Sequence, residues 1–207
     1  MTHSLHRQGP MESLRRDFVI LMDHAVGFNN KGVAPKASMV IDAFLEAGSI
    51  NWSDRQQVGD GKWRTPDEYK AGLSDKTRLR GVLLSKEAVV TFLKCLQRDD
   101  PGMSITVSGL LDEVEDACEE VGITPHTINF SLGVWGNTAM LPPNEVLALT
   151  TMCGHHLISA QLVEEGIAGV KAGTKTIDEV CTTLNNLCPC GLFNRERARE
   201  LLEEYTA

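Results

Sequence analysis

The sequence predicts an α/β fold, with a central, mainly parallel sheet flanked by helices and an all-helical C-terminal extension. Three β-like segments, LRGVLLS, MSITVSG and HTINFSLGVWG, alternate with the helix-like segments KEAVVTFLKCLQRDD and LLDEVEDACEEVG. Alternation of this kind, with short connections, is typical of parallel strands joined by crossover helices. We therefore expect the strands that begin near Gly81, Met103 and His126 to be parallel neighbours with right-handed crossovers.

The N-terminal part of the sequence fits two kinds of secondary structure. Residues 11–26 carry an apolar stripe at helical spacing, which favours a helix, although DFVILM within them is also a good strand sequence. KASMVIDAFLEAG predicts a helix that ends at Gly48, and TPDEYKAG predicts a helix capped by Thr65 and Glu68. Ser85 is the expected N-cap of the helix that follows it.

Only helical patterns follow Pro142. TIDEVCTTLNNLC begins with a capping box of Thr176 and Glu179, and NRERARELLEEY begins at Asn194, a good N-cap. The MLPPN turn at residues 140–144 separates the two predicted parts. Residues 1–141 form an α/β core with an N-terminal helical segment, and residues 142–207 form the helical extension that carries most of the cysteines.

Composition excludes several classes of protein. A net charge of −8 and a pI near 5.2 argue against a broad nucleic-acid surface, which needs excess Lys and Arg. No apolar run approaches the ~18 residues of a membrane span, and the N-terminal MTHSLHRQGP lacks the apolar core of a signal peptide. We therefore expect a cytoplasmic protein. The chain contains no P-loop, no G-x-G-x-x-G and no G-x-S-x-G motif.

Cysteine and histidine gather in the tail, where TTMCGHH is followed by Cys181 and by the Cys188-Pro-Cys190-Gly turn. In a reducing compartment, cysteines are more often buried, metal-bound or redox-active than disulfide-linked. Soft ligands that converge in this way suit zinc or an iron–sulfur cluster. The expected metal ligands are Cys153, His156, Cys188 and Cys190. His155 or Cys181 could complete the site in place of His156.

Two other interpretations of the tail stay open. The cysteines could form a metal-free reactive pair, or they could simply pack between helices. Pro189 and Gly191 favour a bend that presents Cys188 and Cys190 together. Cys95 and Cys118 lie on apolar helical stripes, so we expect both of them to be core residues.

A second candidate site lies at the expected strand ends, where Ser108, Gly109 and Trp135 could bind a small-molecule or anionic ligand. Against this, Ser108 could be a plain N-cap and Trp135 a packed aromatic residue. The leading hypothesis is a cytoplasmic metal-binding protein whose site is structural or redox-active. The alternatives are a small-molecule enzyme and a non-catalytic module that forms a homo-oligomer. The sequence does not identify any catalytic residue.

Several stretches together carry a resemblance that covers most of the chain: GFNNKGVAPK, ITVSGLLDEV, PHTINFSLGVWG, TTMCGHH and CPCGLFNRERARELL. In these stretches the sequence resembles an uncharacterised family of hypothetical proteins from anaerobic bacteria and archaea. The resemblance implies an oxygen-free setting, in which an exposed iron–sulfur site would be tolerated. It implies no activity.

Overall fold

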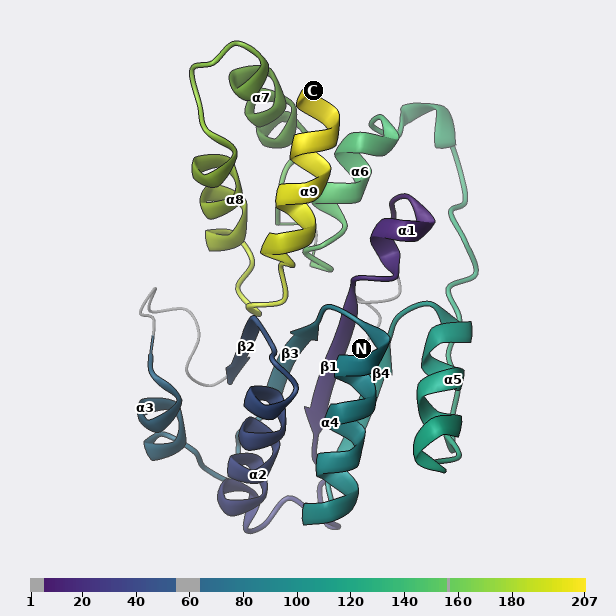
Figure 1. Ribbon diagram of the computed structural model, residues 1–207, viewed down its shortest axis with the longest axis vertical. Helices are drawn as coiled ribbons and strands as arrows, with labels where there is room; N and C mark the ends of the chain where they lie inside the picture. Colours follow the sequence, from purple (N-terminus) through teal and green to yellow (C-terminus); the bar gives the residue numbers. More distant parts are fainter. Residues whose placement is uncertain (1–5, 55–63, 156) are drawn as a thin grey trace. The chain divides into compact units, whose positions relative to one another are not determined.

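The structure is a computed structural model that describes residues 6–54, 64–155 and 157–207. The chain divides into two compact units (Figure 1). The β unit comprises Arg15–Thr124 and Pro189–Leu192. The helical unit comprises Met1–Leu14, Pro125–Cys188 and Phe193–Ala207.

The β unit contains a four-stranded sheet with the order β2-β3-β1-β4, in which every neighbouring pair is antiparallel. Its strands are β1 (Phe18–Asp23), β2 (Asn51–Asp54), β3 (Leu79–Leu83) and β4 (Ser104–Ser108). Its helices are α2 (Val33–Glu46), α3 (Pro66–Ala71), α4 (Lys86–Asp99) and α5 (Leu111–Val121). This order is that of two interleaved β-α-β units, the split β-α-β arrangement.

The predicted parallel sheet is therefore wrong. β3 and β4 run in the same direction and are joined by α4, as expected, but β1 lies between them and is antiparallel to both. The third expected strand, near His126, is also wrong, because residues 127–135 form neither helix nor strand. The long helix over residues 11–26 is replaced by the short α1 (Met11–Leu14) and by β1, so the strand alternative for DFVILM is confirmed.

Burial explains the position of β1. Phe18, Val19, Ile20, Leu21 and Met22 are each at most 1% exposed. A strand of consecutive apolar residues loses this surface to water only when both of its faces are covered, and a central position also covers both of its edges. The run of apolar residues in β1 therefore favours a central position in the sheet over a position at its edge.

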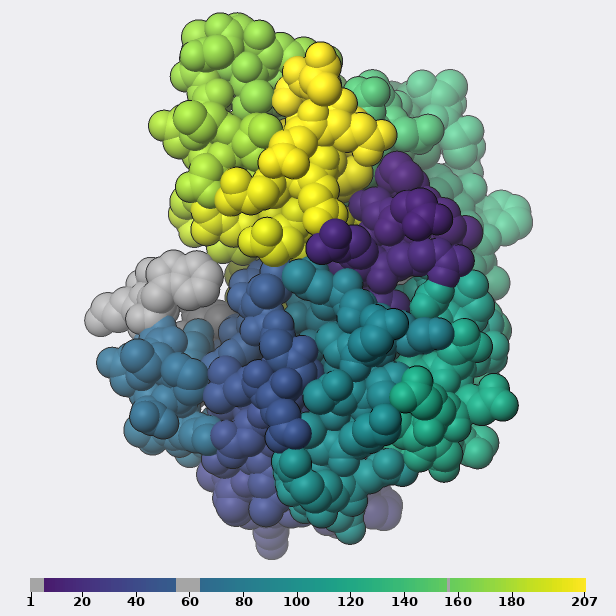
Figure 2. Space-filling view, viewed as in Figure 1, coloured from purple at the N-terminus to yellow at the C-terminus, as the bar shows by residue number. Residues whose placement is uncertain are grey.

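The core of the β unit lies between the sheet and its helices. The rings of Phe44 in α2 and Phe92 in α4 stack with their centroids 4.8 Å apart, and the two helices lie side by side in Figure 2. Gly81 in β3 accommodates Phe44, because a Cβ atom there would overlap the ring. Cys95 and Cys118 belong to this core, as predicted.

Most predicted helix ends in the β unit are confirmed. The Ser85 side chain accepts a hydrogen bond from the Ala88 N–H, and Thr65 and Glu68 form the expected capping box. Gly48 has φ 69° and follows Ala47, the C-cap of α2. The exception is Ser108, which is the last residue of β4 and not an N-cap. The N-cap of α5 is Leu110, which makes no side-chain capping bond.

The described residues of the helical unit contain helices and no strand. These helices are α1, the 3₁₀ turn η2 (Thr138–Met140), α6 (Asn144–Thr150), α7 (Ala160–Lys171), α8 (Ile177–Asn186) and α9 (Arg195–Thr206). The capping box of Thr176 and Glu179 and the N-cap at Asn194 are confirmed. Across the described part of the whole chain, no helix has the length and apolar character needed to cross a membrane.

Arg197 connects the two ends of the chain within the helical unit. Its side chain is fully buried in α9. Its Nε donates to Ser13 Oγ at 2.7 Å, and its Nη2 donates to the Gln8 carbonyl at 2.6 Å. Gly9 leaves room for the guanidinium, because a Cβ atom at that position would overlap Nη2. The N-terminal segment is thus fixed to the last helix by hydrogen bonds to a charged group, which are stronger than those between neutral groups.

The contact between Gly81 and Phe44 generates the first prediction. Gly81→Ala should lower the free energy of unfolding by about 1–3 kcal/mol, because the added methyl group overpacks a closed core. Phe44→Leu should relieve part of this cost, so the double variant should lose at least about 0.5 kcal/mol less than the sum of the single losses. Denaturant unfolding followed by circular dichroism measures all three variants. Strictly additive losses would show that the two residues do not interact.

Candidate functional site

Two buried thiols meet in the helical unit. Cys153 lies in the turn after α6, where its N–H donates to the Thr150 carbonyl at 3.3 Å. Cys188 lies just after α8, and its N–H donates to the Asn185 carbonyl at 3.0 Å. Both residues are buried, and Cys153 is fully inaccessible. Two helix ends thus place two soft ligands in a protected position.

The environment of Cys153 favours the thiolate form. The Cys188 thiol donates a hydrogen bond to its sulfur, and the backbone N–H groups of His155 and Leu157 donate two more. The hydrogen bond from Cys188 contributes most to lowering the pKa of Cys153 to about 5, and burial opposes this change. The electrostatic effect of the nearby His155 acts in the same direction. The donors around Cys153 thus stabilise a negative charge on its sulfur.

Cys181 is in a different state. It lies within α8 and is fully inaccessible, and burial raises its pKa to about 11. At neutral pH this thiol keeps its proton and behaves as a small apolar side chain. Its surroundings resemble those of Cys95 and Cys118, whose pKa values burial also raises.

Cys190 belongs to the β unit, where it forms part of the predicted turn. Gly191 has φ 64°, a conformation that glycine adopts without strain. The Ser53 hydroxyl donates to the Cys190 carbonyl at 2.6 Å and so holds the turn against β2. The Cys190 side chain is half-buried. The bend expected from Pro189 and Gly191 is thus present.

The predicted metal ligands are only partly brought together. The structure joins Cys153 to Cys188, and His156 lies outside the described residues. Among the residues that are described, no three His, Cys, Asp or Glu side chains are grouped so that they could hold a metal ion. The full ligand set of Cys153, His156, Cys188 and Cys190 therefore stays a prediction.

The second candidate site divides between the units. Ser108 pairs with Val19 at the end of β4, and Gly109 lies against the Phe18 ring, where a Cβ atom would not fit. Trp135 belongs to the helical unit and is 81% exposed, with its indole N–H donating to the Leu132 carbonyl at 2.9 Å. The packed-aromatic interpretation of Trp135 is therefore wrong. A ligand at Ser108, Gly109 and Trp135 stays a prediction.

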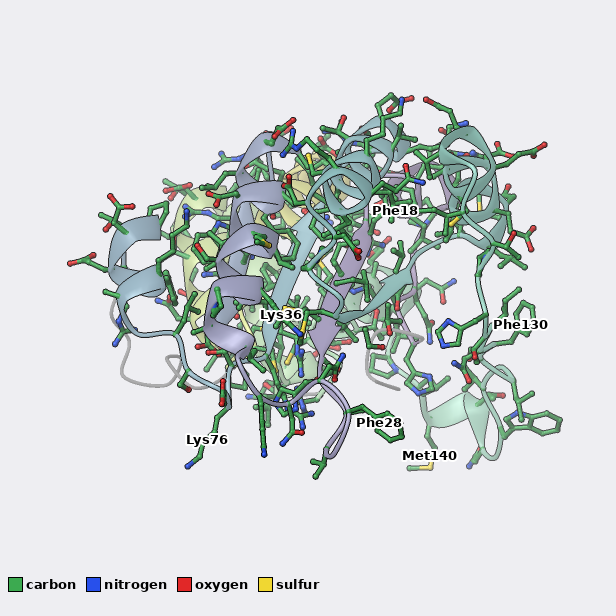
Figure 3. All side chains as sticks on the ribbon, turned by 90° about the horizontal axis from the view of Figure 1, so that it is seen from below. Phe18, Phe28, Lys36, Lys76, Phe130 and Met140 are labelled. Carbon is green, nitrogen blue, oxygen red and sulfur yellow. The ribbon has the colours of Figure 1, made fainter. Side chains whose placement is uncertain are left out.

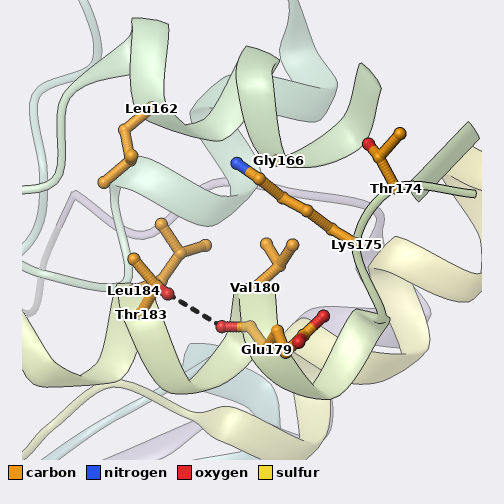
Figure 4. A pocket seen from close by; sticks show the side chains of 8 residues that line it. All are labelled: Leu162, Gly166, Thr174, Lys175, Glu179, Val180, Thr183 and Leu184. Atoms are coloured by element: carbon orange, nitrogen blue, oxygen red, sulfur yellow. Dashed lines mark hydrogen bonds between the residues drawn. The ribbon is translucent and has the colours of Figure 1, made fainter. Parts of the chain in front are cut away.

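Pockets in the helical unit lie away from the thiol pair. One of about 240 Å³ lies between α7 and α8, where Lys175 and Glu179 flank the apolar Leu162 and Val180 (Figure 4). Another, of about 620 Å³, is lined by the N-terminal segment, the start of α6 and Tyr205. Neither is lined by a cysteine, so the thiol pair is not part of a small-molecule cavity in either case.

Comparison with known proteins adds no assignment, because no family model, curated protein or solved structure matches this chain. The resemblance to the family from anaerobic bacteria and archaea stays a prediction. The function must therefore be argued from the thiol pair itself.

Two groups that act on Cys153 could not be read from side-chain patterns, namely the N–H groups of His155 and Leu157.

The hydrogen bond between the two thiols can be tested by titration. In metal-free protein, the ultraviolet absorbance of the Cys153 thiolate should persist at neutral pH and disappear as the pH falls through about 5. Cys188→Ala removes the S–H donor, so the transition should move to higher pH. Cys181→Ala is the matched control, because its thiol is buried nearby in sequence but is protonated at neutral pH. A transition that responds to Cys181→Ala and not to Cys188→Ala would contradict the assignment.

Proposed function

We propose that this protein binds a soft metal, either zinc or the iron of an iron–sulfur cluster, through Cys153 and Cys188. The observation that carries the proposal is the hydrogen bond between two buried thiols contributed by the ends of α6 and α8. Thiolate sulfur is the preferred protein ligand of both metals. A pair of sulfurs in direct contact supplies two ligands on one side of an ion.

The stabilisation of negative charge on Cys153 supports a bound cation over thiols that only pack in the core. Three donors converge on Cys153: one S–H and two N–H groups. Such an arrangement stabilises negative sulfur, and buried negative charge is costly unless an opposite charge compensates it. A divalent cation provides that compensation and takes the place of the thiol protons, which are released on binding. N–H donors to a ligating sulfur also hold its orientation and tune the metal.

The position of Cys188 is also favourable. It follows α8, whose last carbonyl groups carry partial negative charge. A cation beside them is stabilised by the same effect that favours Lys and Arg at the ends of helices.

The remaining ligands rest on the sequence. Only Pro189 separates Cys190 from Cys188, so their Cα atoms can be at most about 7 Å apart. We therefore keep Cys190 as the third ligand. We also propose that the protein works in the cytoplasm, where reducing conditions keep the thiols available to a metal.

A redox dithiol is the second candidate, and the contact between the two sulfurs favours it too. The Cys153 thiolate would attack a small disulfide such as oxidised glutathione and release one glutathione thiolate. Cys188, after losing its proton, would displace the second and leave an intramolecular disulfide. The complete burial of Cys153 opposes attack on an external disulfide, so this candidate ranks below metal binding.

Metal analysis of anaerobically purified protein tests the proposal. We expect either stoichiometric zinc in a colourless protein or iron and sulfide with broad visible absorbance. Cys153→Ser and Cys188→Ser should each weaken metal affinity by more than the ~10–100-fold that follows loss of an outer-shell partner. Cys95→Ser is the matched control, because Cys95 is a buried core residue of the β unit.

Cys190→Ser should weaken metal affinity to a similar degree if Cys190 is a ligand. Wild-type protein that binds neither zinc nor iron, yet forms a Cys153–Cys188 disulfide with oxidised glutathione, would replace metal binding by the redox candidate. Wild-type protein that neither binds these metals nor forms this disulfide would refute both candidate functions.

A further inference from the structure

An exposed apolar segment leads from the β unit into the helical unit. Every residue from 124 to 141 is exposed. The large apolar residues are Ile128 (47%), Phe130 (63%), Leu132 (84%), Val134 (54%), Trp135 (81%), Met140 (81%) and Leu141 (42%). Figure 3 shows Phe130 and Met140 projecting away from the ribbon. Single exposed apolar residues are ordinary, but a continuous series of this length marks a site of interaction.

The segment has the pattern of a strand without its partner. Ile128, Phe130, Leu132 and Val134 occupy alternate positions, and the residues between them are Asn, Ser and Gly. In an extended chain, alternation of this kind places Ile128, Phe130 and Leu132 on one face, and Val134 joins them once Gly133, which has φ 90° here, becomes extended. Within the described chain, residues 127–135 belong to no sheet. The Gly133 N–H and the Leu132 carbonyl bond only to the nearby side chains of Ser131 and Trp135, which a second strand would have to replace.

The exposed area matches what a stable dimer needs. A fully exposed aromatic side chain presents roughly 200 Å², and a smaller aliphatic side chain is taken as roughly 150 Å². With the exposed fractions above, the seven residues present about 750 Å² per chain. This exceeds the largest apolar patch of a typical monomer, about 300–600 Å². It is close to one partner's share of a standard interface, which is about 800 Å².

Charge favours a second copy of this chain over an unrelated partner. Residues 121–144 contain no Asp, Glu, Lys or Arg, whereas the whole chain has a net charge of −8. Two copies of an acidic protein repel each other unless their contact surface is uncharged. The segment provides such a surface, and it lacks the charged residues that protect natural strand edges from pairing.

We propose that residues 127–135 pair with the same residues of a second copy, as antiparallel strands related by a two-fold axis at Ser131, so that Phe130 lies opposite Leu132 and Ile128 opposite Val134. In such an isologous contact, each apolar residue faces an apolar residue of the other copy on a common face. Trp135, Met140 and Leu141 of both copies supply further apolar surface beside that face. The pairing is independent of the thiol site, which lies elsewhere in the helical unit.

Sedimentation of the full chain over a wide range of concentration tests the pairing. Wild-type protein should be a dimer. Phe130→Asp and Leu132→Asp should each raise the dissociation constant at least about tenfold, because each removes apolar contact and places like charges close together. Phe28→Asp is the matched control: Phe28 is 91% exposed in the β unit, and its loss should leave the dimer intact.

Circular dichroism and thermal melting should show that the variants keep their fold, because both side chains are exposed. Hydrogen exchange should show protected amides in residues 127–135 of the wild type and their loss in Leu132→Asp. A wild-type monomer overturns the proposal, and protection of the segment in that monomer would show that it is covered within its own chain. A dimer that is unaffected by both substitutions also overturns the proposal.

Discussion

Burial of β1 on both faces is the constraint on which the arrangement of the β unit depends. Five consecutive apolar residues, Phe18 to Met22, are withdrawn from water, and a central strand is covered along its edges as well as on its faces. In this sheet β3 and β4 lie on either side of β1, and all neighbouring strands are antiparallel. The central position of β1 also shapes the core. Ile20 of β1 pairs with Gly81 of β3, and the Phe44 ring packs against Gly81.

Local signals in the sequence predict most individual helices and strands, but they do not predict the order of the strands in the sheet. The caps at Ser85, Thr65 and Thr176 depend on side chains and backbone groups within four residues, so they could be recognised directly. The sheet order depends on DFVILM, which suits a helix or a strand equally well by pattern. If DFVILM is taken as part of a helix, the central strand β1 is missing from the expected sheet. The remaining order of β3, α4 and β4 then indicates neighbouring parallel strands.

The sequence indicated which cysteines to consider but only part of their arrangement. Cysteine content and the Cys-Pro-Cys-Gly turn pointed to the tail, and the contact between Cys153 and Cys188 joins residues that are far apart in the sequence. What distinguishes Cys153 from Cys181 is the set of donors around it, and two of these are backbone groups without any residue signature. The segment near His126 carries a true strand pattern, yet a strand forms only when a partner supplies its hydrogen bonds.

The connection made by Arg197 has a consequence for how the protein is made. The helical unit contains residues from both ends of the chain, whereas nearly all of the β unit is the continuous stretch Arg15–Thr124. A ribosome completes that stretch first, and domains generally fold as their residues emerge. The helical unit must wait until Arg197 has left the exit tunnel and can hold Gln8 and Ser13. The site of Cys153 and Cys188 can therefore form only after the continuous stretch of the β unit has been synthesised.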